Sequence, residues 1–159
     1  MARKGCIMFG QQVIFSAANQ SYGFDSMKVR TIESDYRLST IPGAPGCIVG
    51  LADLRGEIIP VCDIYKKFNL RGTVAPGNNT IFVNTEEGCL GCLVDEITEI
   101  GAVGEDLQMT LPLIARNDST NYVDGIIRHK NTLVTVVNPD KVLTPEEWKA
   151  VHALLKDAK

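Results

Sequence analysis

Several features are missing from this 159-residue sequence, and each absence excludes a class of protein. Positive charge is not in excess, because 19 Asp and Glu outweigh 16 Lys and Arg, so the basic footprint of a nucleic-acid-binding protein is absent. No apolar run approaches the roughly 18 residues that a membrane-spanning helix needs, so we expect no direct membrane insertion. Neither a Gly-x-Gly-x-x-Gly loop nor a Walker A loop occurs, and nothing predicts a phosphate-binding site.

The N-terminal segment and the cysteines indicate a reducing compartment. Residues 1–10 carry two positive charges and a short apolar stretch, which Gln11 and Gln12 interrupt before it reaches the length of a secretory signal. The five cysteines are an odd number, which argues against a complete disulfide framework. We therefore expect a cytoplasmic protein.

The sequence has enough apolar material for one well-packed domain spanning residues 1–159. It is 45% hydrophobic and 22% charged, as in ordinary globular proteins. Most of it consists of short segments rich in β-branched residues, separated by Gly, Pro and Asn. The predicted strands include residues 13–15, 22–24, 48–51, 58–61, 81–83, 90–94, 126–127 and 133–137. This pattern predicts a mostly β fold, either a sandwich or a barrel.

One helix is predicted over residues 144–158. Thr144 and Glu147 form a capping box, and Pro145 occupies the first helical position. Apolar residues follow at helical spacing, namely Trp148, Val151, Leu154, Leu155 and Ala158. This apolar face predicts a helix that packs against the β structure.

An internal repeat carries information about the organisation of the chain. When the sequence is shifted by 75 positions, residues 50–61 align with residues 125–136, so that glycine meets glycine and the following apolar order is kept. The turn in each copy places a basic residue before Gly56 or Asn131. Gly and Asn most readily adopt the positive φ of a tight hairpin, so both copies predict the same turn.

A second match aligns Tyr22-Gly23-Phe24 with Leu90-Gly91-Cys92 and continues to Ile32 and Ile100. The two matches together predict two similar β lobes, about residues 7–75 and 76–143, each too small to be robust alone. The alternative is that both segments have converged on common hairpin chemistry.

Catalytic chemistry has few candidates in this sequence. Cys89 and Cys92 form a Cys-x-x-Cys pattern, which in other settings is redox-active or binds zinc. Side chains three residues apart on a strand point to opposite faces, so these thiols are expected to diverge. His129 is expected to be a solvated residue at a hairpin tip. We expect no catalytic residue, cofactor or metal, and a thiol-dependent enzyme using Cys89 and Cys92 is kept as an alternative.

Residues 50–64 closely resemble a block of the CheW family of chemotaxis coupling proteins. That block typically has Asn-Leu-Arg-Gly followed by two β-branched residues, Pro and Val, and here Asp53 replaces the usual Asn. Weaker similarity extends from Val13 to Leu143. The resemblance implies two five-stranded β-barrels that share a hydrophobic seam, with short helices.

The resemblance also implies a function. Members of the family are non-enzymatic adaptors that bridge the cytoplasmic tip of methyl-accepting receptors to the regulatory domain of a CheA-type histidine kinase. The alternative is a CheW-like scaffold for a pilus, gliding or developmental kinase array.

The partner-binding residues that the resemblance implies, or that border them, are Val29, Ile32, Gly50, Leu54, Arg55 and Gly56. For Gly50 and Gly56, simple turn geometry is an equally good explanation. Thr31 and Glu33 depart from the family pattern around Ile32.

Overall fold

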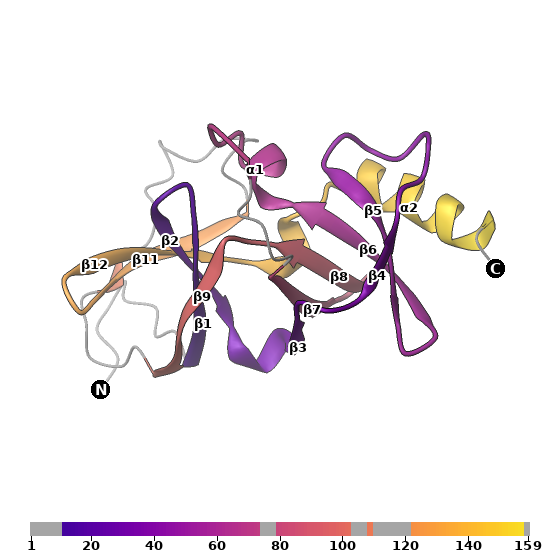
Figure 1. Cartoon of the computed structure of the whole chain (residues 1–159). Coiled ribbons are helices and arrows are strands. Elements are labelled where there is room, and N and C mark those ends of the chain that lie inside the picture. Colours follow the sequence, from indigo (N-terminus) through magenta and orange to yellow (C-terminus); the bar gives the residue numbers. More distant parts are fainter. Residues whose placement is uncertain (1–10, 74–78, 103–107, 110–121, 158–159) are drawn as a thin grey trace.

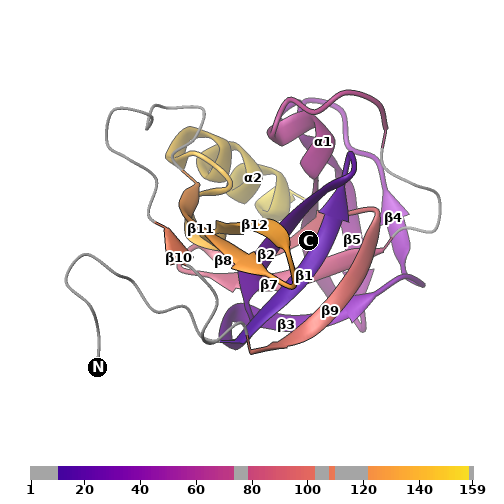
Figure 2. The ribbon, with the colours of Figure 1, turned by 90° about the vertical axis from the view of Figure 1, so that its left-hand side faces the viewer.

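Two curled sheets form most of the molecule (Figures 1 and 2). The computed structural model describes residues 11–73, 79–102, 108–109 and 122–157. The expected lobe start at residue 7, the expected lobe boundary at 75/76 and the expected helix end at 158 lie outside the described residues.

Sheet A and sheet B each contain five strands of five to seven residues and one short edge strand, so the prediction of a mostly β fold with two similar lobes is confirmed. In spatial order, sheet A consists of β10 (Gln108–Met109), β11 (Val123–His129), β12 (Thr132–Val137), β2 (Gln20–Asp25), β1 (Gln11–Ala17) and β9 (Glu96–Ala102). Sheet B consists of β3 (Val29–Glu33), β7 (Thr80–Thr85), β8 (Gly88–Leu93), β6 (Glu57–Asp63), β5 (Ile48–Leu54) and β4 (Arg37–Ser39).

The described helices are η1 (Ser26–Lys28), α1 (Ile64–Lys67), η4 (Pro139–Lys141) and α2 (Pro145–Asp157), of which η1 and η4 are single 3-10 turns. Both views place α1 and α2 on the upper side of the molecule, away from β3 (Figures 1 and 2). Within the described residues, no helix is both long and apolar enough to cross a membrane.

The sheets do not follow the expected division into residues 7–75 and 76–143. All six strands of sheet B lie within 29–93, whereas sheet A combines 11–25 with 96–137. The β1–β2 hairpin joins sheet A through a parallel pairing of β2 with β12, and the β7–β8 hairpin joins sheet B through a parallel pairing of β8 with β6. The repeat in the sequence therefore marks equivalent hairpins, but each half of the chain contributes one of its hairpins to the other sheet.

The two hairpins that the repeat aligns have the same geometry. In β5–β6 the strand register shifts between Ile48 and Gly50, and in β11–β12 it shifts at the equivalent place, between Val123 and Gly125. The turn residues all have positive φ, which is 54° at Arg55, 89° at Gly56, 50° at Lys130 and 64° at Asn131. Two successive positive φ values define the tight turn that matches strand twist, so the predicted turn chemistry is confirmed in both copies.

A large apolar cluster fills the seam between the sheets. This seam cluster combines β1, β2 and β12 of sheet A with β5, β6, β7 and β8 of sheet B, and residues of α1 and α2 pack into it. Its members include Val13, Phe15, Tyr22, Phe24, Cys62, Ile64, Ile81, Val83, Leu90, Cys92, Val137, Trp148 and Val151. Each sheet also encloses a smaller cluster, made of Ile14, Ile127, Val134 and Val136 in sheet A and of Ala52, Ile59, Val61, Phe82 and Leu93 in sheet B. The expected shared hydrophobic seam is therefore present.

Helix α2 begins with the predicted capping box. The Thr144 N–H donates to Glu147 Oε1 at 2.9 Å, and the Glu147 N–H donates to Thr144 Oγ1 at 3.1 Å. Trp148 and Val151 are buried in the seam cluster, and Leu155 packs against it half-buried. The cap and the apolar face thus place α2 as predicted.

Candidate partner-binding surface

Arg55 stands at the tip of the β5–β6 hairpin, where its side chain is 79% exposed. Its Nη2 lies 3.6 Å from Glu33 Oε2, which is a loose ion pair. The Gly56 N–H donates to Asp53 Oδ1 at 3.0 Å and closes the turn. An asparagine at position 53 would accept this hydrogen bond through its amide oxygen, so the carboxylate of Asp53 preserves the turn. The tip therefore presents a guanidinium with unused donors.

Charged residues of both signs surround this tip. Arg30 of β3 pairs with Glu57 of β6 at 2.8 Å and donates through Nε to Asn84 Oδ1 at 3.1 Å. Thr31 Oγ1 donates to Glu33 Oε2 at 2.6 Å, so the two departures from the family pattern contact each other. Because Glu33 also faces Arg55, these departures set the local charge beside the exposed guanidinium.

Val29 and Ile32 lie on β3, an edge strand of sheet B, and both pack half-buried against the seam cluster. Their register partners on β7 are Val83 and Ile81, which are fully buried. Met27, two residues before Val29, is 87% exposed. The edge of sheet B therefore presents partly exposed apolar side chains next to the seam, whereas Arg55 is at the hairpin tip.

Gly50 is the buried member of the predicted site residues, and Leu54 is half-buried like Val29 and Ile32. Gly50 is buried, and a Cβ built on it would lie 2.5 Å from the backbone oxygen of Ser39 in β4. This close approach of two strands explains the glycine without a partner. Leu54 is half-buried against the sheet B cluster. Of the six predicted residues, Arg55 and Gly56 are exposed, and a partner-binding role stays a prediction for all six.

Cys89 and Cys92 lie on opposite faces of β8, as the strand spacing predicts. Cys92 is buried in the seam cluster, and Cys89 packs half-buried against the sheet B cluster. Burial raises the pKa of both thiols, so the reactive thiolate is disfavoured at each position. Among the described residues, no group of three His, Cys, Asp or Glu side chains is arranged to hold a metal ion. The geometry gives no support to thiol chemistry.

The prediction that His129 is solvated is wrong. Its side chain is only 12% exposed, and its Nε2 lies 2.8 Å from Glu99 Oε2. Lys130 Nζ approaches Glu99 Oε1 at 3.0 Å. Hydrogen bonds from His129 and Lys130 hold the pKa of the Glu99 carboxyl below its ordinary value. Sequence reasoning missed this cluster because Glu99 comes from β9, about 30 positions earlier, and no local pattern signals the contact.

Comparisons with known proteins agree with this architecture. A family model described as the CheW-like domain matches residues 11–147. The chemotaxis protein CheW of Treponema pallidum (strain Nichols) is 29% identical over 149 residues, covering 91% of this chain and 88% of that protein. The chemotaxis protein CheW of Klebsiella aerogenes is 28% identical over 149 residues, covering 92% of this chain and 90% of that protein.

A solved structure is also similar. The crystal structure of the scaffolding protein TtCheW from Thermoanaerobacter tengcongensis superposes with a TM-score of 0.78 at 27% identity. The match covers 88% of this chain and 96% of that one.

Proposed function

This chain belongs to the family of CheW-like domains, and from that premise we propose that it is an adaptor coupling methyl-accepting chemoreceptors to a CheA-type histidine kinase. The observation that carries the proposal is the family match over residues 11–147, which spans both sheets. An adaptor needs two contact regions, and the hairpin tip at Arg55 and the apolar edge at Val29 supply neighbouring candidates, since Glu33 of β3 faces Arg55. In this proposal the protein is non-enzymatic, works in the cytoplasm and is recruited to receptor arrays at the membrane.

The kinase contact is assigned to Arg55. Its guanidinium is exposed and only loosely paired, and arginine forms bidentate hydrogen bonds to carboxylates or backbone carbonyls. Arginines at the centre of interfaces are frequent hot spots. The equivalent cation of sheet A, Lys130, lacks the planar fork and is engaged by Glu99 at 3.0 Å.

The Arg55→Ala variant tests this assignment. We expect affinity for the isolated kinase regulatory domain to fall roughly thirtyfold, measured by calorimetry. The stability of the free protein should change by no more than about 0.5 kcal/mol, since Arg55 is exposed. Lys130→Ala is the matched control, and its affinity should stay within about twofold of wild type. Unchanged affinity with a large loss of stability in Arg55→Ala would show that Arg55 holds the fold.

The receptor contact is assigned to the seam edge at Val29 and Ile32. Receptor tips are helical hairpins, and a helix docks on an apolar surface through anchors at helical spacing. We expect a tip fragment of a methyl-accepting receptor from the same organism to shift the methyl resonances of Val29 and Ile32 in NMR titrations. Shifts confined to residues far from β3, such as Ile127 in the sheet A cluster, would overturn the assignment.

The coupling role itself requires both partners at once. Size-exclusion chromatography with light scattering should detect a ternary complex of this chain, the receptor fragment and the kinase regulatory domain. If the chain binds only one partner, or if the partners exclude each other, it does not couple them. The calorimetric affinity measurement can be repeated with the regulatory domain of every CheA-type kinase of the organism. The kinase that binds most tightly shows whether the chain serves chemotaxis or a pilus, gliding or developmental array.

A further inference from the structure

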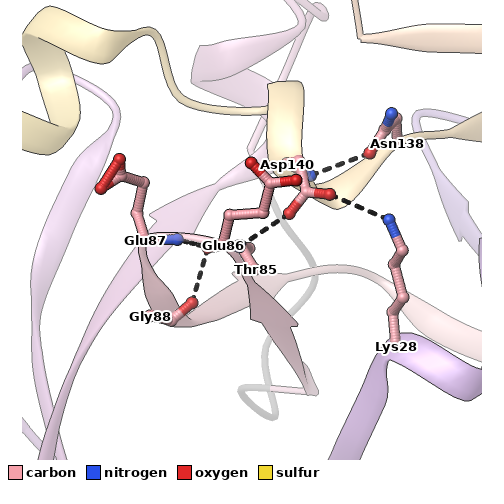
Figure 3. Close-up of polar contacts among 7 residues, drawn as sticks. All are labelled: Lys28, Thr85, Glu86, Glu87, Gly88, Asn138 and Asp140. Carbon is pink, nitrogen blue, oxygen red and sulfur yellow. Dashed lines mark hydrogen bonds and ion pairs between the residues drawn. The ribbon is translucent and has the colours of Figure 1, made fainter.

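Asp140 joins three segments that are far apart in the sequence (Figure 3). It lies in η4, which follows β12, the strand of sheet A nearest the C-terminus. Its Oδ2 accepts from Lys28 Nζ at 2.9 Å, and its Oδ1 accepts from the backbone N–H of Glu86 at 2.9 Å. One carboxylate therefore contacts both the segment that leaves sheet A after β2 and the β7–β8 turn of sheet B.

Hydrogen bonds of the backbone around Asp140 also hold this residue in place. The Asp140 N–H donates to Asn138 Oδ1 at 3.0 Å, and the Asn138 N–H donates to the backbone oxygen of Tyr122 at 2.8 Å. Burial raises the pKa of the Asp140 carboxyl, but the hydrogen bonds from Lys28 and Glu86 outweigh burial and hold that pKa below its ordinary value. Asp140 is therefore ionised at neutral pH and able to pair with the ammonium.

The β7–β8 turn is an ordered partner for this carboxylate. Thr85 Oγ1 donates to the Gly88 backbone oxygen at 2.7 Å and accepts from the Glu87 N–H at 3.1 Å. The ring Nε2 of His152 in α2 lies 3.0 Å from the Glu87 backbone oxygen. The turn is thus tied to both η4 and α2, which follow sheet A in the chain.

Lys28 connects this network to the proposed receptor contact. It is the last residue of η1, the short helix through which the chain passes from sheet A to sheet B, and η1 contacts both β1 and β7. The next residue is Val29, the first residue of β3. Since successive Cα atoms are only about 3.8 Å apart, a displacement of Lys28 also moves Val29.

We propose that Asp140 is a positioning residue for receptor binding, which acts through Lys28 to fix Val29 at the seam edge. This inference rests on the proposed function, and it goes beyond it by assigning a role to a residue outside the contact surface. Apolar packing in the seam holds the sheets together but is non-directional. A hydrogen bond between charged groups is directional, so it fixes the relative position of the two segments that it joins. Asp140 thus sets the position of the edge strand relative to sheet A.

Three single variants, one double variant and a control test the role of Asp140. Asp140→Asn keeps an oxygen for the Glu86 N–H but removes the charge that pairs with Lys28. Lys28→Met removes the ammonium and keeps the apolar stem, and Lys28→Arg restores a cation. Lys141→Met, an exposed neighbour on η4, is the matched control. The readouts are the methyl resonances of Val29 and Ile59 in the free protein, and the affinities for the receptor fragment and the kinase regulatory domain.

We expect Asp140→Asn and Lys28→Met to move the Val29 methyl resonances in the same way, with Ile59 in the sheet B cluster unmoved. Each of these two variants should lower receptor affinity about fivefold. The double variant Asp140→Asn/Lys28→Met should lower it no further, because both substitutions remove the same interaction. Kinase affinity should stay within about twofold in every variant, and Lys28→Arg and Lys141→Met should match wild type in both affinities.

Three results would overturn the proposal. The first is that the Val29 methyl resonances do not move in either Asp140→Asn or Lys28→Met. The second is that the losses of receptor affinity multiply in the double variant. The third is that kinase affinity falls as much as receptor affinity, which would show general destabilisation. If the wild-type chain does not bind the receptor fragment at all, the proposed function fails instead. The methyl resonances of the free protein still decide whether Asp140 positions Val29.

Discussion

The two hairpin tips have the same backbone but different side-chain contacts. Arg55 and Lys130 both have φ near +50°, yet Arg55 lies 3.6 Å from its carboxylate and Lys130 lies 3.0 Å from its own. Exposed ion pairs contribute at most about 1 kcal/mol, so a partner carboxylate can replace Glu33 at Arg55 at little cost. In sheet A, Glu99 contacts both Lys130 and His129, so a partner carboxylate replaces Glu99 at Lys130 less easily.

Gly50 also gives a prediction at the residue scale. Close packing of β5 against β4 and partner binding both explain this glycine, and they predict different effects of substitution. In Gly50→Ala the new Cβ would lie 2.5 Å from the Ser39 oxygen, and β4 must shift to relieve the overlap. We expect the free energy of unfolding in urea to fall by about 2 kcal/mol. Gly46→Ala is the control, because a Cβ there meets nothing within 4 Å. A stable Gly50→Ala protein that no longer binds the kinase domain would instead make Gly50 a contact residue.

At the scale of elements, one carboxylate both caps α2 and attaches it to the body of the protein. Glu147 accepts from the Thr144 N–H in the capping box and pairs with Lys67 of α1. Cys47 also approaches Glu147 Oε2, at 3.5 Å. Burial raises the pKa of the Glu147 carboxyl, but the hydrogen bonds from Lys67 and Thr144 outweigh burial and lower it overall. The attachment of α2 therefore depends on an ionised carboxylate.

This attachment predicts a pH-dependent contribution to stability. A group with a lowered folded pKa stabilises the protein above its ordinary value, about 4.3 for Glu, and loses that contribution as the pH falls through the folded pKa. Glu147→Gln keeps the capping oxygen and should destabilise the protein by about 1 kcal/mol at pH 7.

Urea unfolding at several pH values measures the effect of Glu147→Gln. The difference between wild type and the variant should be constant above about pH 6 and shrink towards pH 3. Glu146→Gln, which changes an exposed carboxylate in the same helical turn, is the control and should show no such trend. A difference independent of pH would mean that the charge of Glu147 contributes nothing.

At the scale of the whole molecule, the exchange of hairpins between the halves makes the sheets interdependent. The β7–β8 hairpin needs β6 and β3 from the first half, and β9 and β12 need β1 and β2. The seam cluster then packs residues of both sheets against each other. Splitting the chain near its middle therefore leaves neither sheet complete.

Fragments test this interdependence. Within residues 76–159, four strands (β7, β8, β9 and β12) lack a neighbour that the first half supplies, and we expect no cooperative urea transition for this fragment. Residues 29–93 contain all six strands of sheet B, so their backbone amides should be better protected from hydrogen exchange than those of residues 76–159. The exposed seam face makes this fragment less stable than the full chain. A full-size denaturant slope for residues 76–159 would contradict the shared core.

Features that depend on neighbouring residues could be predicted from the sequence alone. The capping box at Thr144, the positive φ at Gly56 and Asn131 and the divergent thiols of Cys89 and Cys92 all follow from chemistry within a few positions. The mostly β class follows from the same local signals, and the repeat identified equivalent hairpins. The family resemblance is likewise carried by a contiguous block, residues 50–64, and needs no knowledge of the fold.

The tertiary structure decided what depends on distant residues. A strand carries the same pattern whichever neighbour it pairs with, so the sequence could not show that β2 pairs with β12 or β8 with β6. A carboxylate likewise has no local mark of its partner, and the contacts of Asp140 with Lys28 and of Glu99 with His129 appear only after folding. The chain's local chemistry determined the turns, caps and strands, and their three-dimensional packing determined which of them meet.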